Sequence, residues 1–216
     1  MKNNITELVF ILDRSGSMNG LVSDTIGGFN AMIEKQRREE GEAYVTTVLF
    51  DTRFERIYDR LKLRDVPPLT EREYVPGGCT ALLDAVGQTI RHIAQIHRYA
   101  RPEDVPAKTV FVITTDGLEN ASRFFRREEV KKMIEHEQEK YGWEFLFLGA
   151  NIDAAETAGD LGIREDRAAN FNADKRGVEL SFNSIAHAVS AMRCSMPLTR
   201  AWKDEVENDC RSRKQD

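Results

Sequence analysis

The sequence predicts an α/β fold of three layers, in which helices cover both faces of a doubly wound, mostly parallel sheet. Short apolar segments with the composition of buried strands alternate along the chain with helical patterns, as such a sheet requires. Two of these strands are joined only by Asp51-Thr52-Arg53, a connection too short for a parallel crossover. We therefore expect one antiparallel edge strand.

The first half of the chain contains the expected hairpin. Residues 8–12 are an uninterrupted apolar run, which is typical of a strand buried on both faces. Residues 23–40 are expected to be helical, because Ile26, Phe29 and Ile33 share one face and charged residues the other. Residues 45–50 and 54–63 form the hairpin, and the second of these strands is expected at the sheet edge. Proline and glycine residues then mark a loop before a helix at about 81–97.

The second half continues the alternation. We expect a central strand at 108–114, a charged surface helix at 128–140 and a strand at 145–149. A short helix at 154–161, a short strand at 168–171 and an amphipathic helix at 177–192 follow. After Pro197 the chain becomes polar, and its pattern fits either a docked helix or a mobile tail. We expect a domain over residues 1–193 and a C-terminal polar extension over residues 194–216.

Composition limits the possible functions. The chain has 216 residues, 41% hydrophobic and 31% charged, which is enough for one globular domain. A net charge of -5 argues against general binding to nucleic acid. The polar N-terminus does not resemble a secretory signal, and no apolar run approaches the roughly 20 residues of a membrane span. Cys79, Cys194 and Cys210 form no disulfide framework, so we expect a cytoplasmic location without membrane partners.

Oxygen-bearing side chains follow the first strand in the pattern D-x-S-x-S, formed by Asp13, Ser15 and Ser17. Thr80 follows a glycine pair at the start of a helix, and Asp116 follows the strand at 108–114. Ligands of open α/β sheets bind at the carboxyl ends of the strands, where these residues are expected to meet. Oxygen ligands without His or Cys suit Mg²⁺ or another hard divalent ion.

These motifs resemble those of the von Willebrand factor A domain family, over roughly residues 5–192. The family's metal-ion-dependent adhesion site combines D-x-S-x-S with a distant Thr and a distant Asp. The matching positions are Asp13, Ser15, Ser17, Thr80 and Asp116. The resemblance implies a Rossmann-like sheet and a Mg²⁺ or Mn²⁺ site of the bacterial intracellular type. It also implies that the serines bind the metal directly, while Thr80 or Asp116 gains or loses direct contact between conformational states.

A divalent ion surrounded mostly by neutral oxygens attracts an anionic oxygen from outside. We therefore expect a metal-dependent protein–protein interaction module, not an enzyme, whose partner presents an Asp or Glu carboxylate. The alternative is a metal-dependent phosphohydrolase-like enzyme built on a similar sheet edge. Three residues are weaker candidates: Asp84 as a support of the metal ligands, Asn120 as the cap of a turn, and Asn151 at the rim or in a turn.

Other sites fit the sequence less well. A nucleophilic Ser15 or Ser17 lacks the G-x-S-x-G motif, and the histidines fall in or at the ends of expected helices, not in a loop after a late strand. Phosphate transfer on Asp13 would require a second acid where Ser15 stands. The glycine motifs of nucleotide-binding loops are absent. Basic residues between 123 and 132 alternate with glutamates, which favours a solvated helix face over a nucleic-acid site.

Overall fold

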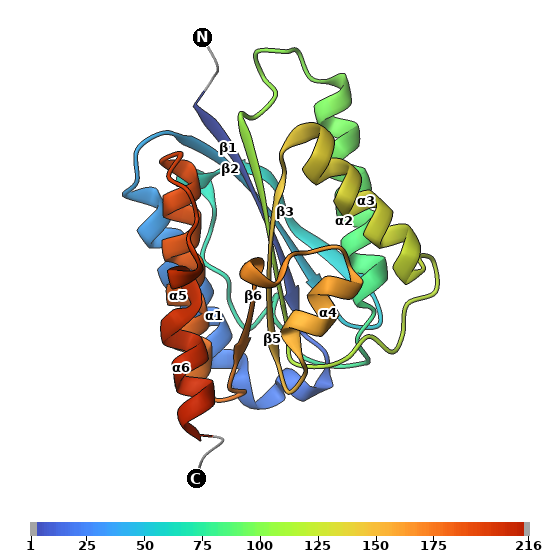
Figure 1. Ribbon diagram of the computed structural model, residues 1–216, viewed down its shortest axis with the longest axis vertical. Helices are drawn as coiled ribbons and strands as arrows, with labels where there is room; N and C mark the ends of the chain where they lie inside the picture. Colours follow the sequence, from blue (N-terminus) through green and yellow to red (C-terminus); the bar gives the residue numbers. More distant parts are fainter. Residues whose placement is uncertain (1–3, 214–216) are drawn as a thin grey trace.

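The computed structural model describes residues 4–213, and its strands form one six-stranded sheet in the order β3-β2-β1-β4-β5-β6 (Figure 1). The strands are β1 (Ile5–Asp13), β2 (Glu42–Phe50), β3 (Phe54–Lys62), β4 (Lys108–Thr115), β5 (Glu144–Ala150) and β6 (Ala168–Phe171). Every neighbouring pair is parallel except β2 and β3, which are antiparallel. The predicted fold class is confirmed.

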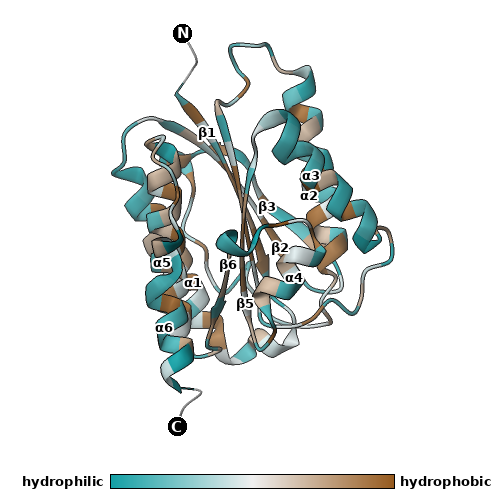
Figure 2. Cartoon of the chain, in the orientation of Figure 1, coloured by the Kyte–Doolittle hydropathy of each residue, from teal (hydrophilic) through white to brown (hydrophobic). Residues whose placement is uncertain are grey.

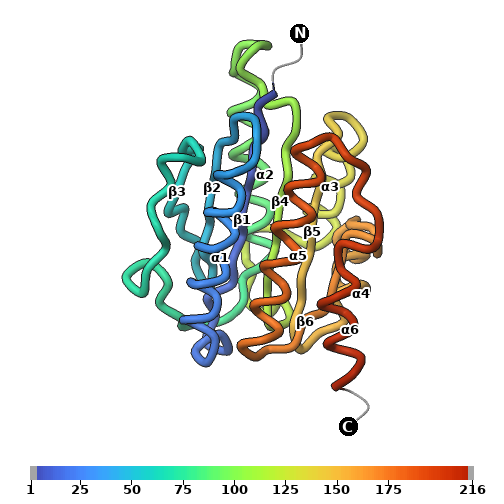
Figure 3. Tube along the Cα trace, turned by 90° about the vertical axis from the view of Figure 1, so that its left-hand side faces the viewer, coloured from blue at the N-terminus to red at the C-terminus, as the bar shows by residue number. Residues whose placement is uncertain are grey.

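Helices cover both faces of the sheet. One face carries α1 (Val22–Arg37), α5 (Lys175–Arg193) and α6 (Asp204–Arg213), which lie in front of the strands in Figure 3. The other face carries α2 (Leu82–Tyr99), α3 (Arg127–Tyr141) and α4 (Ala154–Asp160). Short 3₁₀ turns span Gly16–Leu21, Leu63–Asp65, Glu165–Arg167 and Arg200–Lys203.

Strand side chains alternate between two cores, one on each side of the sheet. Along β1, Leu8, Phe10 and Leu12 pack toward α1 and α5, whereas Val9 and Ile11 pack toward α2 and α3. Figure 2 shows this contrast between hydrophobic strands and the largely hydrophilic α3 and α6. Strands β1 and β4 are buried on both faces, so nearly all their residues are apolar, and this continuous apolar pattern made both strands predictable from the sequence.

Helix α5 begins two residues before the predicted start, because Asp174 caps it. The Asp174 carboxylate accepts a hydrogen bond of 2.8 Å from the backbone N–H of Gly177. A side chain at Gly177 would not fit here, since a Cβ atom would lie 2.0 Å from the carbonyl oxygen of Asn172. The close approach of strand and helix therefore depends on this glycine.

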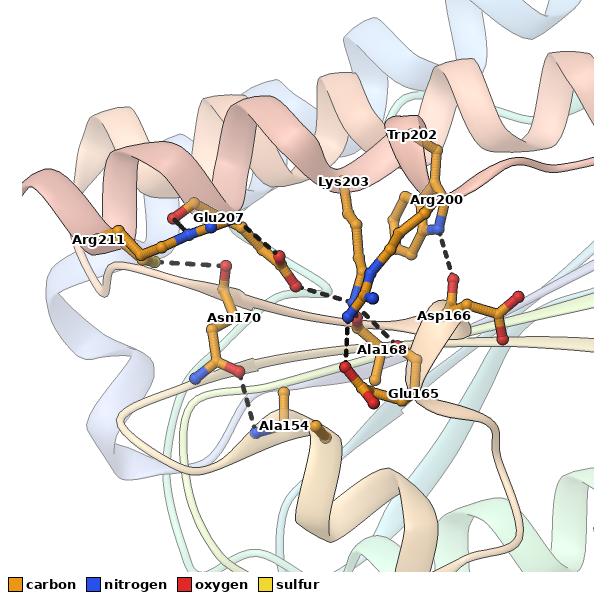
Figure 4. Close-up of polar contacts among 12 residues, drawn as sticks. Ala154, Glu165, Asp166, Ala168, Asn170, Arg200, Trp202, Lys203, Glu207 and Arg211 are labelled. Carbon is orange, nitrogen blue, oxygen red and sulfur yellow. Dashed lines mark hydrogen bonds and ion pairs between the residues drawn. The ribbon is translucent and has the colours of Figure 1, made fainter.

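The segment after Pro197 is a docked helix, not a tail (Figure 4). The indole of Trp202 donates to the carbonyl of Asp166 at 2.9 Å. Lys203 is 1% exposed, and its ammonium donates to the carbonyls of Glu165 at 2.9 Å and Ala168 at 2.6 Å. The carboxylate of Glu207 lies 2.8 Å from the same ammonium. Together with Val206, which is fully buried, these contacts hold α6 against β6.

The predicted division of the chain after residue 193 stays a prediction. Residues 1–3 of the expected domain and 214–216 of the expected extension lie outside the described residues. Within residues 4–213, no helix has both the length and the apolar composition needed to cross a membrane.

We expect Lys203→Met to lower the free energy of unfolding by about 2–4 kcal/mol, because two buried carbonyls and a carboxylate lose their donor. Urea denaturation followed by circular dichroism measures the change. The matched control is Lys175→Met, since Lys175 is exposed on α5. Equal values for the two variants would contradict the role assigned to Lys203.

Candidate metal centre

The predicted site residues lie in loops at the carboxyl ends of β1 and β4 and before α2. Hydrogen bonds join the first loop to the loop before α2: Gly16 N–H donates to Gly78 O at 3.2 Å, and Gly77 N–H donates to Arg14 O at 2.9 Å. Gly78 has a φ of +66°, and a Cβ atom there would lie 2.6 Å from the Thr52 hydroxyl. A glycine is therefore required where the loop before α2 passes Thr52, in the turn between β2 and β3.

Asp13 is held in place on both sides of its carboxylate. Oδ1 accepts from the backbone N–H of Ser15 at 2.7 Å, and Oδ2 accepts from the Thr115 hydroxyl at 2.6 Å. The buried Tyr74 hydroxyl donates to the backbone carbonyl of Asp13. These three contacts orient the last residue of β1.

The hydroxyl groups of Ser15, Ser17 and Thr80 lie in the same region as the two aspartates. Ser15 and Ser17 have their Oγ atoms 3.2 Å apart, and Ser17 Oγ donates to Asp116 Oδ1 at 2.6 Å. Thr80 approaches from the opposite loop: a Cβ atom built at Gly117 would lie 3.6 Å from its Oγ1. The structure thus brings together the side chains of all five residues singled out in the sequence.

Negative charge is concentrated here without a basic partner. Asp13 and Asp116 are 1% and 3% exposed, and neither forms an ion pair with a basic side chain of the described residues. Arg14 points elsewhere, with its guanidinium 3.0 Å from Asp51 and 3.0 Å from Glu55. Burial raises the pKa of Asp13, hydrogen bonds from Thr115 and Ser15 oppose the increase, and the charge of Asp116 adds to it.

The donor set fits a hard divalent cation. Buried carboxylates are normally paired with bases or bound to metals, and this pair has no base. Two carboxylates and three hydroxyls provide oxygen ligands only, as Mg²⁺ or Mn²⁺ prefers. In keeping with this composition, residues 4–213 contain no group of three or more His, Cys, Asp or Glu side chains placed to hold a metal.

Asp84 supports the loop after β4, and within residues 4–213 its carboxylate is hydrogen-bonded to backbone N–H groups of that loop and to none of the predicted ligands. It accepts from the backbone N–H groups of Arg123 at 2.8 Å, Phe124 at 2.9 Å and Phe125 at 2.9 Å. Asn120 also differs from its predicted turn-capping role. Its side-chain oxygen accepts from Thr80 N–H at 2.9 Å, and it therefore anchors the residue that carries the hydroxyl.

Two supporting residues were missed in the sequence. Thr115 binds Asp13, as described above, and Glu119 accepts hydrogen bonds from Leu83 N–H at 2.9 Å and from the backbone and hydroxyl of Ser122 at 2.7 Å each. Glu119 thereby satisfies a free N–H at the start of α2. The only feature of the sequence that could have indicated either residue is that Thr115 directly precedes the motif aspartate, Asp116.

Asn151, the third of the weaker candidates, is exposed at the rim of the site, with its amide nitrogen 3.4 Å from the backbone carbonyl oxygen of Asp116.

No protein-family model matches the sequence, and the comparison with curated proteins gives no match either. Solved structures are similar in fold. The vWF domain of the pilus tip protein Mfa5 from Porphyromonas gingivalis has a TM-score of 0.62 and 13% identity over 87% of this chain and 95% of that domain. The chain has the fold of von Willebrand factor A domains.

Two similar structures contain metals. The mussel byssus protein PTMP1, with a zinc-occupied MIDAS motif, has a TM-score of 0.59 and 13% identity over 88% of this chain. Our chain spans 47% of that protein, about half its length. The manganese-loaded TRAP protein of Plasmodium vivax has a TM-score of 0.56 and 15% identity over 84% of this chain and 74% of that one. At these identities the likeness establishes the fold alone.

We expect Asp84→Asn to loosen the loop at 123–125, because the amide nitrogen cannot accept the hydrogen bonds that a carboxylate oxygen accepts. Amide hydrogen exchange of Arg123, Phe124 and Phe125 should accelerate by at least about tenfold. Asp104→Asn, in an exposed loop at the opposite end of the sheet, is the control. Unchanged exchange at all three amides would show that Asp84 does not hold the loop.

Proposed function

We propose that this chain is a metal-dependent protein-interaction module that binds an acidic side chain of a partner through a divalent cation, Mg²⁺ or Mn²⁺. The residues that would hold the ion are Asp13, Ser15, Ser17, Thr80 and Asp116. The proposal is carried by one observation: Asp13 and Asp116 are buried, adjacent to three hydroxyls, and unpaired with any base in the described part of the chain.

The charges explain why an acidic partner is favoured. Two carboxylates balance one divalent ion, and the hydroxyls of Ser15, Ser17 and Thr80 add no further negative charge. When bound, the ion supplies an electron-poor centre that accepts an additional carboxylate oxygen from outside. Ser17 is exposed, and so are Asn19, two residues later in the chain, and Cys79, which directly precedes Thr80. The zinc-occupied site of the mussel protein and the manganese-loaded Plasmodium protein support a metal in this fold.

A surrounding patch would supply the specificity of binding. Leu118 is 63% exposed directly after the Asp116-Gly117 turn, and Asn151 is exposed next to Asp116. Because one metal contact contributes little selectivity, side chains of this kind decide which acidic segment is bound. We include Gly78, Cys79 and Asn19 in the same patch.

The phosphohydrolase-like alternative has less support from the structure. Its general acid or base would have to reach the site, and three histidines are engaged elsewhere: His92 with Asp59 at 2.8 Å, His97 near Glu7 at 3.5 Å, and His187 with Lys35 at 3.1 Å. His136 lies on α3, against Tyr141. We therefore propose a binding module, not an enzyme. A phosphatase screen with Mg²⁺ or Mn²⁺ tests the alternative.

A cytoplasmic location in a bacterial cell belongs to the same proposal. No disulfide joins Cys79, Cys194 and Cys210, and two of these thiols are exposed. Exposed thiols persist most readily in a reducing compartment. The partner would then be another protein of the cell interior, with neither nucleic acid nor membrane involved.

We expect Asp13→Asn to weaken Mg²⁺ binding by at least about tenfold, because it removes one of the two charges that balance the ion. Calorimetric titration measures the affinity, and circular dichroism verifies the fold. Asp104→Asn changes the same charge far from the site and should leave Mg²⁺ affinity unaltered. Equal affinities for both variants would refute the metal assignment.

We expect capture of the partner to require the metal: EDTA should release it, and Mg²⁺ or Mn²⁺ should restore it. Thr80→Ala should weaken capture by about tenfold, since it removes a neutral ligand without changing the charge. Thr157→Ala, on α4, is the matched control. Replacing the contacting Glu or Asp of the partner with Gln or Asn should abolish most of the binding. Capture of equal efficiency in EDTA would place the interface elsewhere.

A further inference from the structure

The turn that joins β2 to β3 lies at the same edge of the sheet as the metal centre, although it contains none of the predicted ligands. Strand β2 is parallel to β1, with Phe50 opposite Asp13, so the turn at residues 51–53 follows directly at the carboxyl end. The Asp51 N–H donates to the Arg53 carbonyl at 2.8 Å, and the Asp51 carboxylate accepts from the Arg53 N–H at 2.8 Å. These two bonds give the turn a defined shape.

One side of the turn is tied to the loop that follows β1. Arg14 stands between Asp13 and Ser15, and its guanidinium lies 3.0 Å from the Asp51 carboxylate. The side chains of Arg14 and Asp51 are only 13% and 17% exposed, so solvent screens this ion pair less than an ordinary surface pair. A second contact of 3.0 Å joins Arg14 to Glu55 of β3. The loop with the first three predicted ligands is thereby fixed to the hairpin.

The other side of the turn holds the loop that carries Thr80. The Thr52 hydroxyl accepts a hydrogen bond of 2.9 Å from the backbone N–H of Cys79. The Asp51 carbonyl accepts one of 2.9 Å from the backbone N–H of Ala81. The residues immediately before and after Thr80 are therefore both bound to neighbouring residues of one turn, and this restricts where the Thr80 hydroxyl can lie.

The contact between the turn and the Thr80 loop is close but lies at the surface. A Cβ atom at Gly78 would be 2.6 Å from the Thr52 hydroxyl, so the two backbones approach each other directly. Thr52 itself is exposed and lies outside both hydrophobic cores. A side chain in this position contributes little to the stability of the fold as a whole, but it determines the local path of the Thr80 loop.

We propose, on the basis of the proposed metal site, that the turn at 51–53 aligns the two ligand loops and that Thr52 is a positioning residue for Thr80. The turn is joined to the first loop through Arg14 and to the second through Thr52, so one short segment sets the separation of Asp13 and Thr80. Mg²⁺ requires nearly ideal octahedral geometry, with oxygens at about 2.0–2.1 Å. A small displacement of the Thr80 hydroxyl therefore weakens binding, although no ligand has been removed.

The principal variant is Thr52→Val, which removes the hydroxyl and keeps the branched shape of the side chain. In EDTA, amide hydrogen exchange at Cys79 should accelerate by at least about tenfold. Mg²⁺ affinity, measured by calorimetric titration, should fall by about tenfold, and Thr52→Ser should restore it. Thr199→Val makes the same change at another exposed position and should alter neither quantity. Urea denaturation should give similar stabilities for both valine variants.

A double-mutant cycle separates positioning of Thr80 from a general effect on the site. Because Thr52 acts through the Thr80 hydroxyl, Thr52→Val should lower Mg²⁺ affinity in the unmodified chain but cause no further loss in Thr80→Ala. An equal further loss in Thr80→Ala would overturn the positioning role. Unchanged affinity in Thr52→Val, while Asp13→Asn binds weakly, would overturn it too and leave the metal site standing. Equal affinities for Asp13→Asn and the unmodified chain would instead refute the metal site, and the positioning role with it.

Discussion

Two like charges buried side by side, on Asp13 and Asp116, are the constraint on which the site-bearing edge of this molecule depends. Each carboxylate has hydrogen bonds, from Ser15, Thr115 or Ser17, but neither has a basic partner in the described chain. Removing such groups from water is costly unless a cation compensates. The described residues provide no positive charge that compensates these two carboxylates, and this is the observation that supports the proposed metal ion.

The loops around the two carboxylates are fixed by other acidic side chains, which accept hydrogen bonds from backbone N–H groups of the loops and of α2. Asp84 holds residues 123–125, and Glu119 holds the start of α2. Asn120 and Thr80 are joined twice, since the backbone N–H of Asn120 also donates to Thr80 O at 3.0 Å. The side-chain oxygens of Asp84, Glu119 and Asn120 therefore accept hydrogen bonds from backbone N–H groups and fix the loops near the site. Rigid support of this kind fixes the positions of the side chains that form the proposed metal site.

Most of the fold could be predicted because its signals are local. The apolar runs of β1 and β4 reflect burial on both faces, and the three-residue joint at 51–53 allowed only an antiparallel pair. The five motif residues could be placed at one edge because parallel strands end together. Thr115 and Glu119 were not predicted, because their partners are distant in sequence or are backbone atoms, which leave no pattern in the sequence. Asp84 was a candidate, but its backbone partners at residues 123–125 could not be predicted for the same reason. The burial of Lys203 was not predicted for a related reason. A lysine in a polar segment is expected to be exposed, yet the Lys203 side chain is buried and its ammonium contacts three oxygen acceptors.

Helix α6 also determines how the sheet ends. The carbonyls of Ala168 and Asn170 face away from β5, and they are occupied by the Lys203 ammonium and by the Cys210 thiol at 3.3 Å. Lys203, in the 3₁₀ turn before α6, and Cys210 of α6 thus stand where a further strand would otherwise pair. A fragment trimmed to the expected domain boundary would lose this cover and expose a short adhesive edge. Such a fragment would associate with itself through strand pairing, and assays made with it would register contacts that the chain with α6 does not permit.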